Sequence, residues 1–352
     1  MLKKSEIPTP ALLLDRDAFE FNLALMANRA RQSGKLLRPH AKAHKCVEIA
    51  RRQISAGASG VCVATVAEAE LMAKAGIPGL LLTSPLADPR KMARVAATGA
   101  MVAVDHAQQV EWYNEAAQSA GRSLDVLVDL DVGDHRTGAS SVEQGVEIAK
   151  AIGQSSHLRF RGLQAYSVSG SHGKSVEERT HISRMTFDVA IAVRDELNRA
   201  GLPSEILTGG STGTWEVDSA LPEVTELQAG SYVLMDLAYG KLGLPFRNAL
   251  TVLATVVSVN HAGFVTVDGG YKAFSTDRGY GPEARGLPGS QYRWGGDEFG
   301  YLDSAEKPNL GSKIEFIPPH CDPTMNLYDR IYVVNGDTID AVWPVKSNTL
   351  AV

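Results

Sequence analysis

LLRPHAKAHK, residues 36–45, is the stretch from which the fold of this chain can be worked out. After two leucines, residues 38–45 hold five cationic or titratable side chains. Charged clusters usually lie on solvated surfaces, so a basic surface turn is one interpretation. The other is a lysine at the end of a buried strand. Desolvation lowers the pKa of such an amine, and the neutral amine can form a Schiff base.

Around this stretch, short apolar runs alternate with longer amphipathic ones. The predicted strands are Leu36–Lys42, Gly60–Ala64, Gly79–Thr83, Met101–Val104, Leu124–Leu130, Phe160–Tyr166, Glu205–Leu207 and Glu226–Val233. Helical patterns such as 17–33 and Val176–Ala200 occupy most of the intervals. Alternating strands and helices favour a parallel sheet, and eight such units favour a closed (β/α)8 barrel of the TIM type. An open doubly wound sheet is the alternative, but no strand–GxGxxG–helix unit occurs early in the chain.

The pattern changes near Gly240–Pro245. Beyond it helical periodicity is absent. Short β-type runs follow at Leu250–Val259, Phe264–Val267, Lys313–Ile317 and Arg330–Val334. A chain of 352 residues suits a large barrel plus a smaller domain. We therefore expect a barrel over residues 1–244, the first of which can pair with the second domain, and a C-terminal β domain over residues 245–352.

Composition excludes several classes of function. An apolar content of 44% and a charged content of 21% are typical of a soluble globular protein. The net charge of −5 offers no basic stripe, so we expect no nucleic-acid partner. Three cysteines give neither a disulfide framework nor a zinc-finger spacing. We find no signal peptide and no apolar run near the roughly 20 residues that span a bilayer, so we expect a cytoplasmic protein without membrane contact.

Barrel enzymes carry their reactive groups at the carboxyl ends of the strands. Several polar residues of this chain follow predicted strands and should therefore lie on one rim. They are Lys42, Thr65, Arg136, Tyr166, His172 and the run TGGSTGT at 208–214. We take this rim as the candidate active site.

Strand parity separates the two lysines of the opening stretch. Side chains of a strand alternate between its faces, so His40, Lys42 and His44 share one face if the strand continues. Lys45 then points the other way, toward the helix layer or solvent. Lys42 is therefore the predicted Schiff-base lysine, with two neighbouring histidines that can tune its pKa.

The run at 208–214 has the composition of an anion-binding loop. Glycines let backbone N–H groups approach an anion closely, and hydroxyls add donors. Its position after the seventh strand is where phosphate sites recur in barrels. An ordinary flexible loop is the alternative.

A further pair of candidate ligands lies in PPHCDPT, residues 318–324. If the extended conformation continues, as the flanking prolines favour, His320 and Asp322 share a face and Cys321 points away. A histidine with a carboxylate suits Mn²⁺ or Mg²⁺ with waters completing the shell, whereas a thiolate favours Zn²⁺. A His-x-Asp pattern is also common without any metal.

Four segments together resemble the D-threonine aldolase family. They are RPHAKAHKC at 38–46, LDVGDHRTG at 130–138, GLQAY at 162–166 and HCDPTMNLYD at 320–329. TGG at 208–210, TELQAGSY at 225–232 and MD at 235–236 extend the similarity, which runs from about Thr9 to Trp343. This family stands with D-serine dehydratases of the eukaryotic type and D-3-hydroxyaspartate aldolases, in the alanine-racemase-like fold type of pyridoxal-phosphate enzymes.

The resemblance implies a role for each matching residue. Lys42 would bind pyridoxal 5'-phosphate covalently, and His320 and Asp322 would bind the divalent metal. D-Serine dehydratases carry Cys in place of Asp322, which favours the aldolase branch. Arg136 would be a catalytic arginine near the cofactor. The implied cofactor contacts besides Lys42 are Thr65, Tyr166, Gly210, Ser211, Thr212, Gly213 and Tyr232. His172 takes the place of the catalytic base, and the fold type implies a homodimer.

The chain also departs from its relatives. Neither Ala64 nor Thr65 is the Gln that relatives often carry, and Ser167 stands where many aldolases have His after QAY. Phe299 replaces the His of DEHG, and residues 274–296 have no familiar pattern. These positions fall near the expected substrate pocket, so the substrate within the class stays open.

The resulting functional hypothesis is a metal-assisted retro-aldol cleavage of a D-β-hydroxy-α-amino acid, similar to D-threonine, to glycine and an aldehyde. His172, directly or through a metal-bound water, would take the β-hydroxyl proton. The alternative is a D-serine or D-3-hydroxyaspartate dehydratase that forms ammonia and a 2-oxo acid. A third possibility is a non-catalytic pyridoxal-phosphate carrier, against which the late His-x-Asp motif argues.

Overall fold

A computed structural model describes residues 2–346 of the chain. The chain divides into two compact units, each described by itself below. The barrel unit contains Met26–Lys42 and Ile49–Gly230. The β unit contains the described residues up to Leu25, the short segment Ala43–Glu48, and the described residues from Ser231 onward. Within residues 2–346, no helix is both long and apolar enough to cross a membrane.

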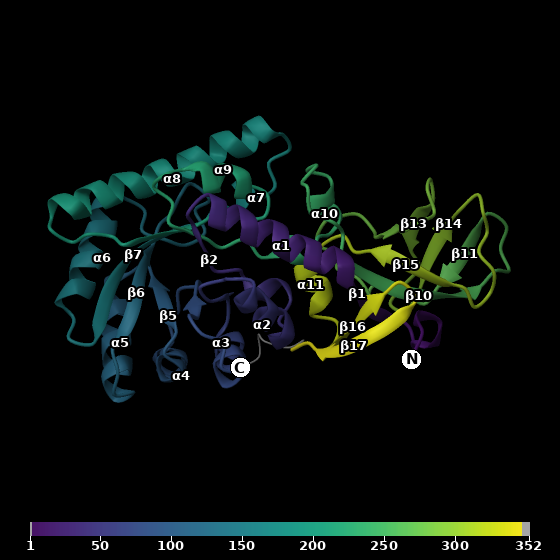
Figure 1. Cartoon of the computed structure of the whole chain (residues 1–352), viewed down its shortest axis with the longest axis horizontal. Coiled ribbons are helices and arrows are strands. Elements are labelled where there is room, and N and C mark those ends of the chain that lie inside the picture. Colours follow the sequence, from purple (N-terminus) through teal and green to yellow (C-terminus); the bar gives the residue numbers. More distant parts are fainter. Residues whose placement is uncertain (1, 347–352) are drawn as a thin grey trace. The chain divides into compact units, whose positions relative to one another are not determined.

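The barrel unit is built on eight parallel strands, which confirms the predicted (β/α)8 architecture (Figure 1). They are β2 (Leu36–Leu37), β3 (Cys62–Val63), β4 (Leu81–Leu82), β5 (Met101–Val104), β6 (Leu124–Asp129), β7 (Leu158–Ala165), β8 (Ile206–Gly209) and β9 (Glu226–Leu227). Their order in the curled sheet is β2-β9-β8-β7-β6-β5-β4-β3. A parallel bridge between His40 and Cys62 links the two ends of this order, and the Cys62 N–H donates to the Pro39 carbonyl at 2.9 Å.

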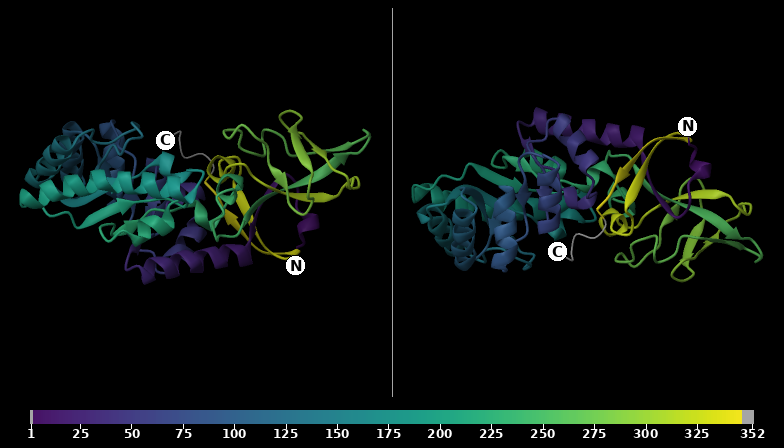
Figure 2. Two further views of the ribbon diagram at one scale, coloured as in Figure 1. Left: turned by 90° about the horizontal axis from the view of Figure 1, so that it is seen from above. Right: turned by 90° about the horizontal axis from the view of Figure 1, so that it is seen from below.

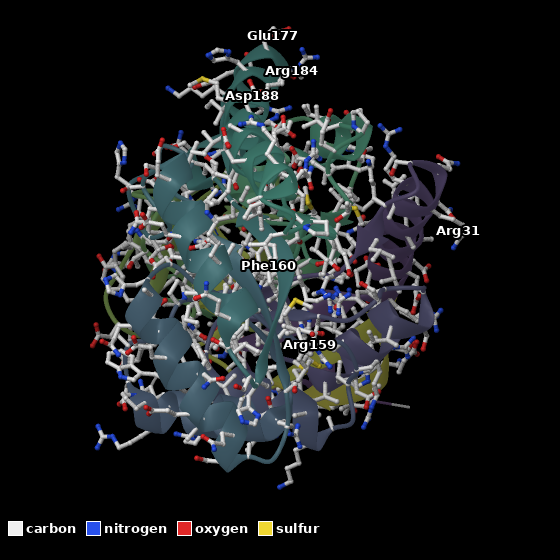
Figure 3. All side chains as sticks on the ribbon, turned by 90° about the vertical axis from the view of Figure 1, so that its left-hand side faces the viewer. Arg31, Arg159, Phe160, Glu177, Arg184 and Asp188 are labelled. Atoms are coloured by element: carbon white, nitrogen blue, oxygen red, sulfur yellow. The ribbon has the colours of Figure 1, made fainter. Side chains whose placement is uncertain are left out.

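Helices surround these strands (Figures 1 and 2). They are α2 (Val47–Ser55), α3 (Val66–Lys74), α4 (Pro89–Thr98), α5 (Ala107–Ser119), α6 (Val142–Gln154), α7 (Val168–Ser171), α8 (Val176–Arg199) and α9 (Trp215–Ala220), preceded by α1 (Arg16–Gln32). Their starts follow local capping rules, because Asp88, Ser141 and Ser175 each accept a backbone N–H of the first turn. Glu177, Arg184 and Asp188 lie on the exposed face of α8 (Figure 3).

The β unit is a largely antiparallel sheet, as expected for the C-terminal part of the chain. Its strands are β1 (Ala11–Asp15), β10 (Leu250–Ser258), β11 (Phe264–Val267), β12 (Glu283–Ala284), β13 (Gln291–Trp294), β14 (Gly300–Asp303), β15 (Lys313–Ile317), β16 (Arg330–Asn335) and β17 (Thr338–Pro344). The N-terminal strand β1 lies between β10, to which it is antiparallel, and β16, to which it is parallel. Ile7, Leu13 and Leu253 pack together in its core.

Two short helices and three 3-10 turns complete the fold. They are α10 (Leu237–Gly240), α11 (Cys321–Met325), and the turns Lys4–Glu6, Ala41–Ala43 and Ser231–Val233. Two of these turns correct the predicted strands. The strand expected over Leu36–Lys42 ends at Leu37, and the one expected over Glu226–Val233 ends at Leu227. Strand parity is therefore not the reason for the position of Lys42.

The predicted extended conformation of residues 320–322 is also wrong. His320 is extended, but helix α11 begins at Cys321. The Cys321 N–H donates to the Asp236 carboxylate at 2.8 Å, and the hydroxyl of Thr324 donates to the His320 carbonyl at 2.7 Å. The Asp236 carboxylate therefore accepts a backbone N–H that has no partner within α11. Pro319 and Pro323 by themselves do not predict this helix.

Candidate active site

The ring of Tyr166 lies between two cationic side chains of the barrel unit. Its centroid is 5.6 Å from Lys42 Nζ and 5.2 Å from Arg136 Cζ. Tyr166 follows β7 directly, Arg136 lies in the loop after β6, and Lys42 lies in the 3-10 turn after β2. Three of the predicted rim residues are therefore neighbours. Lys42 is half-buried, while Ala41 and Ala43 beside it are fully buried, so its side chain is the accessible part of this turn.

His40 supports the turn that carries Lys42. Its Nδ1 accepts the backbone N–H of Lys42 at 3.4 Å, which requires an unprotonated Nδ1. Nε2 then carries the proton and donates it to the Thr83 hydroxyl at 3.1 Å. The neutral tautomer of His40 therefore orients the main chain next to Lys42.

Lys45 has a different environment from Lys42. It is 5% exposed, and its Nζ donates to the backbone carbonyl of Asp322 at 3.4 Å within the β unit. The prediction that Lys45 faces the helix layer or solvent is thus wrong. The backbone of Lys45 is left-handed, with φ 49°, so the strand-like alternation does not reach this residue.

The loop after β8 is held by its own hydroxyl groups. The Ser211 N–H donates to Thr214 Oγ1 at 3.1 Å, and the Gly213 N–H donates to Ser211 Oγ at 3.2 Å. A Cβ on Gly213 would lie 2.1 Å from the Ser171 carbonyl oxygen, so only glycine fits here. Gly210, with φ +78°, turns the chain out of the strand. The predicted anion loop therefore packs closely against the segment that follows Tyr166.

Asp218 of α9 lies beneath this loop. It accepts hydrogen bonds from the hydroxyls of Thr214 and Ser183 and is 1% exposed. Burial raises the pKa of Asp218 to about 6, although these two hydrogen bonds oppose the shift. The loop thus stands on a buried carboxyl group that the sequence analysis did not single out.

His172 ends the short helix α7, which follows Tyr166. The Ser171 hydroxyl lies 3.3 Å from the Tyr166 hydroxyl, which brings this helix to the Tyr166 ring. Asp134 accepts the N–H of Ser169 at 3.3 Å. Burial raises the pKa of Asp134, but hydrogen bonds from Ser169, Val168 and Ser167 outweigh it and leave the pKa below its usual value. The segment that carries His172 is therefore tied to the loop that carries Arg136.

Thr65 and Asp129 are two further residues of the barrel rim, and the sequence analysis predicted only Thr65 as a site residue. Thr65 caps α3 and accepts the Glu68 N–H at 3.2 Å, so its hydroxyl has a structural partner. Asp129, at the end of β6, was not singled out. It accepts hydrogen bonds from Gln164 at 2.8 Å and Thr137 at 2.9 Å, and burial raises its pKa to about 6. It directly precedes the LDVGDHRTG segment at 130–138, which was the available signal.

The remaining predicted site residues lie in the β unit. Tyr232 is fully buried, with its ring centroid 5.7 Å from that of Phe246. His320 Nδ1 lies 2.7 Å from Asp277 Oδ2. Asp322 Oδ1 is 3.2 Å from the Cys321 thiol, which donates to it. Among residues 2–346, no group of three or more His, Cys, Asp or Glu side chains is arranged to hold a metal ion.

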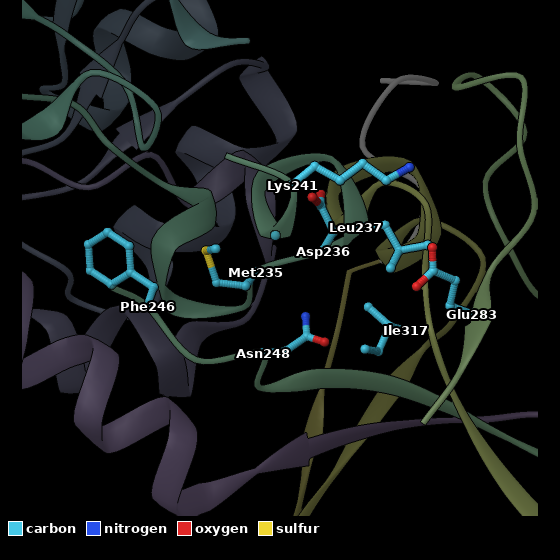
Figure 4. Close-up of a pocket in the computed structure, with 9 residues that line it drawn as sticks. Met235, Asp236, Leu237, Lys241, Phe246, Asn248, Glu283 and Ile317 are labelled. Carbon is cyan, nitrogen blue, oxygen red and sulfur yellow. The ribbon is translucent and has the colours of Figure 1, made fainter. Parts of the chain in front are cut away.

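Asp236 connects this region to a cavity of about 310 Å³ within the β unit (Figure 4). Its carboxylate caps α11 through the Cys321 N–H and accepts the Tyr239 N–H at 2.9 Å. Burial raises the pKa of Asp236, an effect opposed by these hydrogen bonds and by the nearby His320. Asn248 lines the same cavity.

Cys321 differs from its two neighbours in the HCD motif. Burial raises the pKa of its thiol well above the usual value, and Asp236 and Asp322 raise it further. Cys321 is fully buried, whereas His320 and Asp322 are partly exposed, so the histidine and the carboxylate are the more accessible candidate ligands.

Comparison with known proteins places the whole chain in one group. The family model for the alanine racemase N-terminal domain matches residues 14–238, and that for a putative serine dehydratase domain matches residues 249–334. A D-threonine aldolase of Arthrobacter sp. is 37% identical, with 97% of this chain and 93% of the relative covered. A 3-hydroxy-D-aspartate aldolase of Paracoccus denitrificans is 36% identical, covering 98% and 93%.

Solved structures agree with this grouping. The crystal structure of D-threonine aldolase from Filomicrobium marinum superposes with a TM-score of 0.95 at 36% identity, covering 98% of this chain and 96% of that one. Dehydratases are less similar in sequence: a D-threo-3-hydroxyaspartate dehydratase of Delftia sp. is 29% identical over 96% of this chain and 97% of its own.

Proposed function

The chain belongs to the D-threonine aldolase family, and from this premise we propose that it cleaves a D-β-hydroxy-α-amino acid to glycine and an aldehyde. The observation that carries the proposal is the group formed by Lys42, Arg136 and Tyr166, next to the hydroxyl-rich loop after β8. An amine, an aromatic ring and a polar loop on one barrel rim match the parts of pyridoxal 5'-phosphate.

The residues of the rim fit this cofactor. The half-buried amine of Lys42 would hold it covalently as a Schiff base, and the Tyr166 ring would line it. The loop approaches Ser171 so closely at Gly213 that a side chain is excluded, and its glycines and hydroxyls are the composition of an anion-binding loop. When bound, the cofactor supplies an electron sink for the bond that breaks. The proposed phosphate contacts are Gly210, Ser211, Thr212 and Gly213, with Arg136, Thr65 and Tyr232 as further contacts.

His172 is the proposed general base. It would take the proton of the substrate β-hydroxyl, so that the oxygen forms the carbonyl of the aldehyde as the Cα–Cβ bond breaks. A histidine suits this step because its usual pKa lies near neutrality. Its position at the end of α7, directly after Ser171, whose hydroxyl lies 3.3 Å from the Tyr166 hydroxyl, supports the assignment.

A divalent ion at His320 and Asp322 is a separate part of the proposal. Imidazole and carboxylate are ligands that Mn²⁺ and Mg²⁺ accept, and waters would complete the shell because no third protein ligand is arranged in the described residues. The Cys321 thiol is fully buried and donates to Asp322 Oδ1 at 3.2 Å, which argues against a thiolate ligand for Zn²⁺. A bound ion would lower the pKa of a coordinated hydroxyl.

Dehydration is the second candidate function. It is favoured by the match of residues 249–334 to a putative serine dehydratase domain. The reaction would form ammonia and a 2-oxo acid from D-serine or D-3-hydroxyaspartate, with Lys42 taking the Cα proton. The higher identity to aldolases favours the first candidate. Incubation of the holoenzyme with each D-amino acid, followed by assays for glycine and for 2-oxo acid, separates the two.

A homodimer and a cytoplasmic location also belong to the proposal. Both rest on the resemblance and on composition.

A further inference from the structure

Asp277 lies within residues 274–296, a stretch that resembles no family motif. It is not among the predicted site residues. In the β unit its Oδ2 atom is 2.7 Å from Nδ1 of His320. The two residues are 43 positions apart in the chain, so this contact is made by the fold and not by a local turn. Asp277 therefore contacts one of the two proposed metal ligands directly.

This contact determines which nitrogen of His320 carries the proton. An ionised carboxylate can only accept hydrogen bonds, so Nδ1 must be the donor. In the neutral ring, Nε2 then has a free electron pair directed away from Asp277. Histidines that bind metals commonly donate their second N–H to a carboxylate, which sets the tautomer and the ring orientation.

The same segment also holds the main chain of His320. The Ser275 hydroxyl donates to the His320 carbonyl at 3.2 Å, and the Thr324 hydroxyl donates to the same carbonyl at 2.7 Å. The Ser275 N–H donates in turn to the Thr324 hydroxyl at 3.1 Å. Ser275 and Thr324 are both buried. Residues 275–277 thus restrain His320 at its backbone and at its ring.

An ordinary surface ion pair is the alternative explanation. Such pairs contribute little to stability. The side chain of His320 is only 20% exposed, and its backbone carbonyl accepts two hydroxyl donors. Because its backbone carbonyl and its Nδ1 atom are both hydrogen-bonded, the direction of Nε2 is more restrained than in an isolated ion pair.

We propose that Asp277 is a positioning residue that orients His320 for a divalent metal ion. This inference rests on the proposed function in one respect, namely that His320 is a metal ligand. It adds that affinity for the ion depends on a carboxylate outside the HCD motif. Loss of a hydrogen-bonding partner behind a metal-bound histidine typically weakens metal binding about 10–100-fold.

The test is a titration of the pyridoxal-phosphate-loaded protein with MnCl₂, with free Mn²⁺ measured by electron paramagnetic resonance. The Asp277→Ala variant should bind Mn²⁺ about 10–100-fold more weakly than the wild type. The Asp277→Asn variant should lose less Mn²⁺ affinity, because its amide oxygen can still accept a hydrogen bond from the Nδ1–H group of His320. His320→Ala serves as the reference for loss of the ligand itself.

Asp303→Asn is the matched control. Asp303 lies in the same unit and pairs with Arg293 at 2.6 Å, and its side chain is 36% exposed compared with 43% for Asp277. Its replacement should leave Mn²⁺ affinity unchanged. The absorbance band of the bound cofactor and the melting temperature of the Asp277→Asn variant should stay close to those of the wild type.

Each result decides between the possibilities. Wild-type affinity in both Asp277 variants, together with loss of binding in His320→Ala, overturns the positioning role and leaves the metal proposal intact. Equal weakening in Asp277→Asn and Asp303→Asn also overturns it, since net charge would then be the cause. Binding that survives in His320→Ala removes the metal proposal and the role of Asp277 with it. If Asp277→Ala does not fold, Asp277→Asn carries the test.

Discussion

The Nζ atom of Lys42 lies 5.6 Å from the centroid of the Tyr166 ring. Lys42 belongs to a turn after the first barrel strand and Tyr166 follows the sixth, so the barrel brings together residues more than a hundred positions apart. Arg136 approaches the same ring at 5.2 Å. The first of the predictions below follows from this group of three side chains.

Replacement of Lys42 tests the covalent attachment. The Lys42→Ala variant should lose the visible absorbance band of the bound cofactor, because it removes the half-buried amine that lies 5.6 Å from the Tyr166 ring. Lys45→Ala is the neighbouring control and should keep the band, since the Lys45 amine donates to the Asp322 carbonyl in the other unit. A band that persists in Lys42→Ala contradicts the assignment.

Replacement of His172 tests the general base. The His172→Gln variant should lose about 10²–10⁴-fold in kcat, the usual contribution of a general base. The cofactor band should be unchanged, because His172 is not a proposed cofactor contact. His181→Gln, at an exposed position of α8, is a suitable control. Unchanged kcat in His172→Gln removes this residue from the mechanism.

Buried Asp218 gives a prediction on stability. Its pKa in the folded state is raised to about 6 from 3.8, so the folded protein binds the proton more tightly than the unfolded chain. Its contribution to the free energy of unfolding is therefore fully present below pH 3.8 and is lost as the pH rises through about 6. A shift of about two pKa units corresponds to about 3 kcal/mol.

The Asp218→Asn variant should remove this dependence, because the amide does not ionise. Denaturant unfolding between pH 4 and pH 7 should show the variant gaining up to about 3 kcal/mol relative to the wild type as the pH rises. Asp188→Asn, on the exposed face of α8 (Figure 3), is the control and should show no such trend. A constant difference between Asp218→Asn and the wild type would mean that the Asp218 pKa is not raised.

Chelation tests the divalent ion proposed at His320 and Asp322. Treatment with EDTA should abolish turnover and leave the cofactor band in place, because the proposed ligands His320 and Asp322 are not cofactor contacts. Addition of Mn²⁺ should restore turnover. Full activity after exhaustive chelation would count against both the aldolase and the dehydratase forms of the metal mechanism.

The sequence predicts those parts of the fold that depend on local apolar runs. Strands β11 and β15 begin and end where their runs do, and each of the eight barrel strands lies within or overlaps a predicted run. Strand β13 lies in the Gly-rich stretch between Arg278 and Gly300, and the sequence analysis did not predict it. Its side chains alternate between exposed and partly buried positions, and none is fully buried. Pairing with a neighbouring strand defines such a strand, and the short sequence run does not indicate that pairing.

The candidate site also contains residues that the sequence indicates and residues that it does not. Lys42 and Tyr166 stand out because they follow apolar runs in motifs. Asp218 and Asp277 do not, because their importance comes from hydrogen bonds to residues far along the chain. The turn at Ala41–Ala43 was also hidden. Pro39 lacks the N–H that a ladder requires, and His40 uses its ring to hold the Lys42 backbone, so the strand ends before the lysine.

The central claim is that this chain breaks a carbon–carbon bond of a D-β-hydroxy-α-amino acid. The most direct test is to incubate the holoenzyme with D-threonine and Mn²⁺ and to measure all products. The account predicts glycine and acetaldehyde in equal amounts, with no turnover of L-threonine. Formation of ammonia and 2-oxobutanoate without glycine would contradict it and establish a dehydratase.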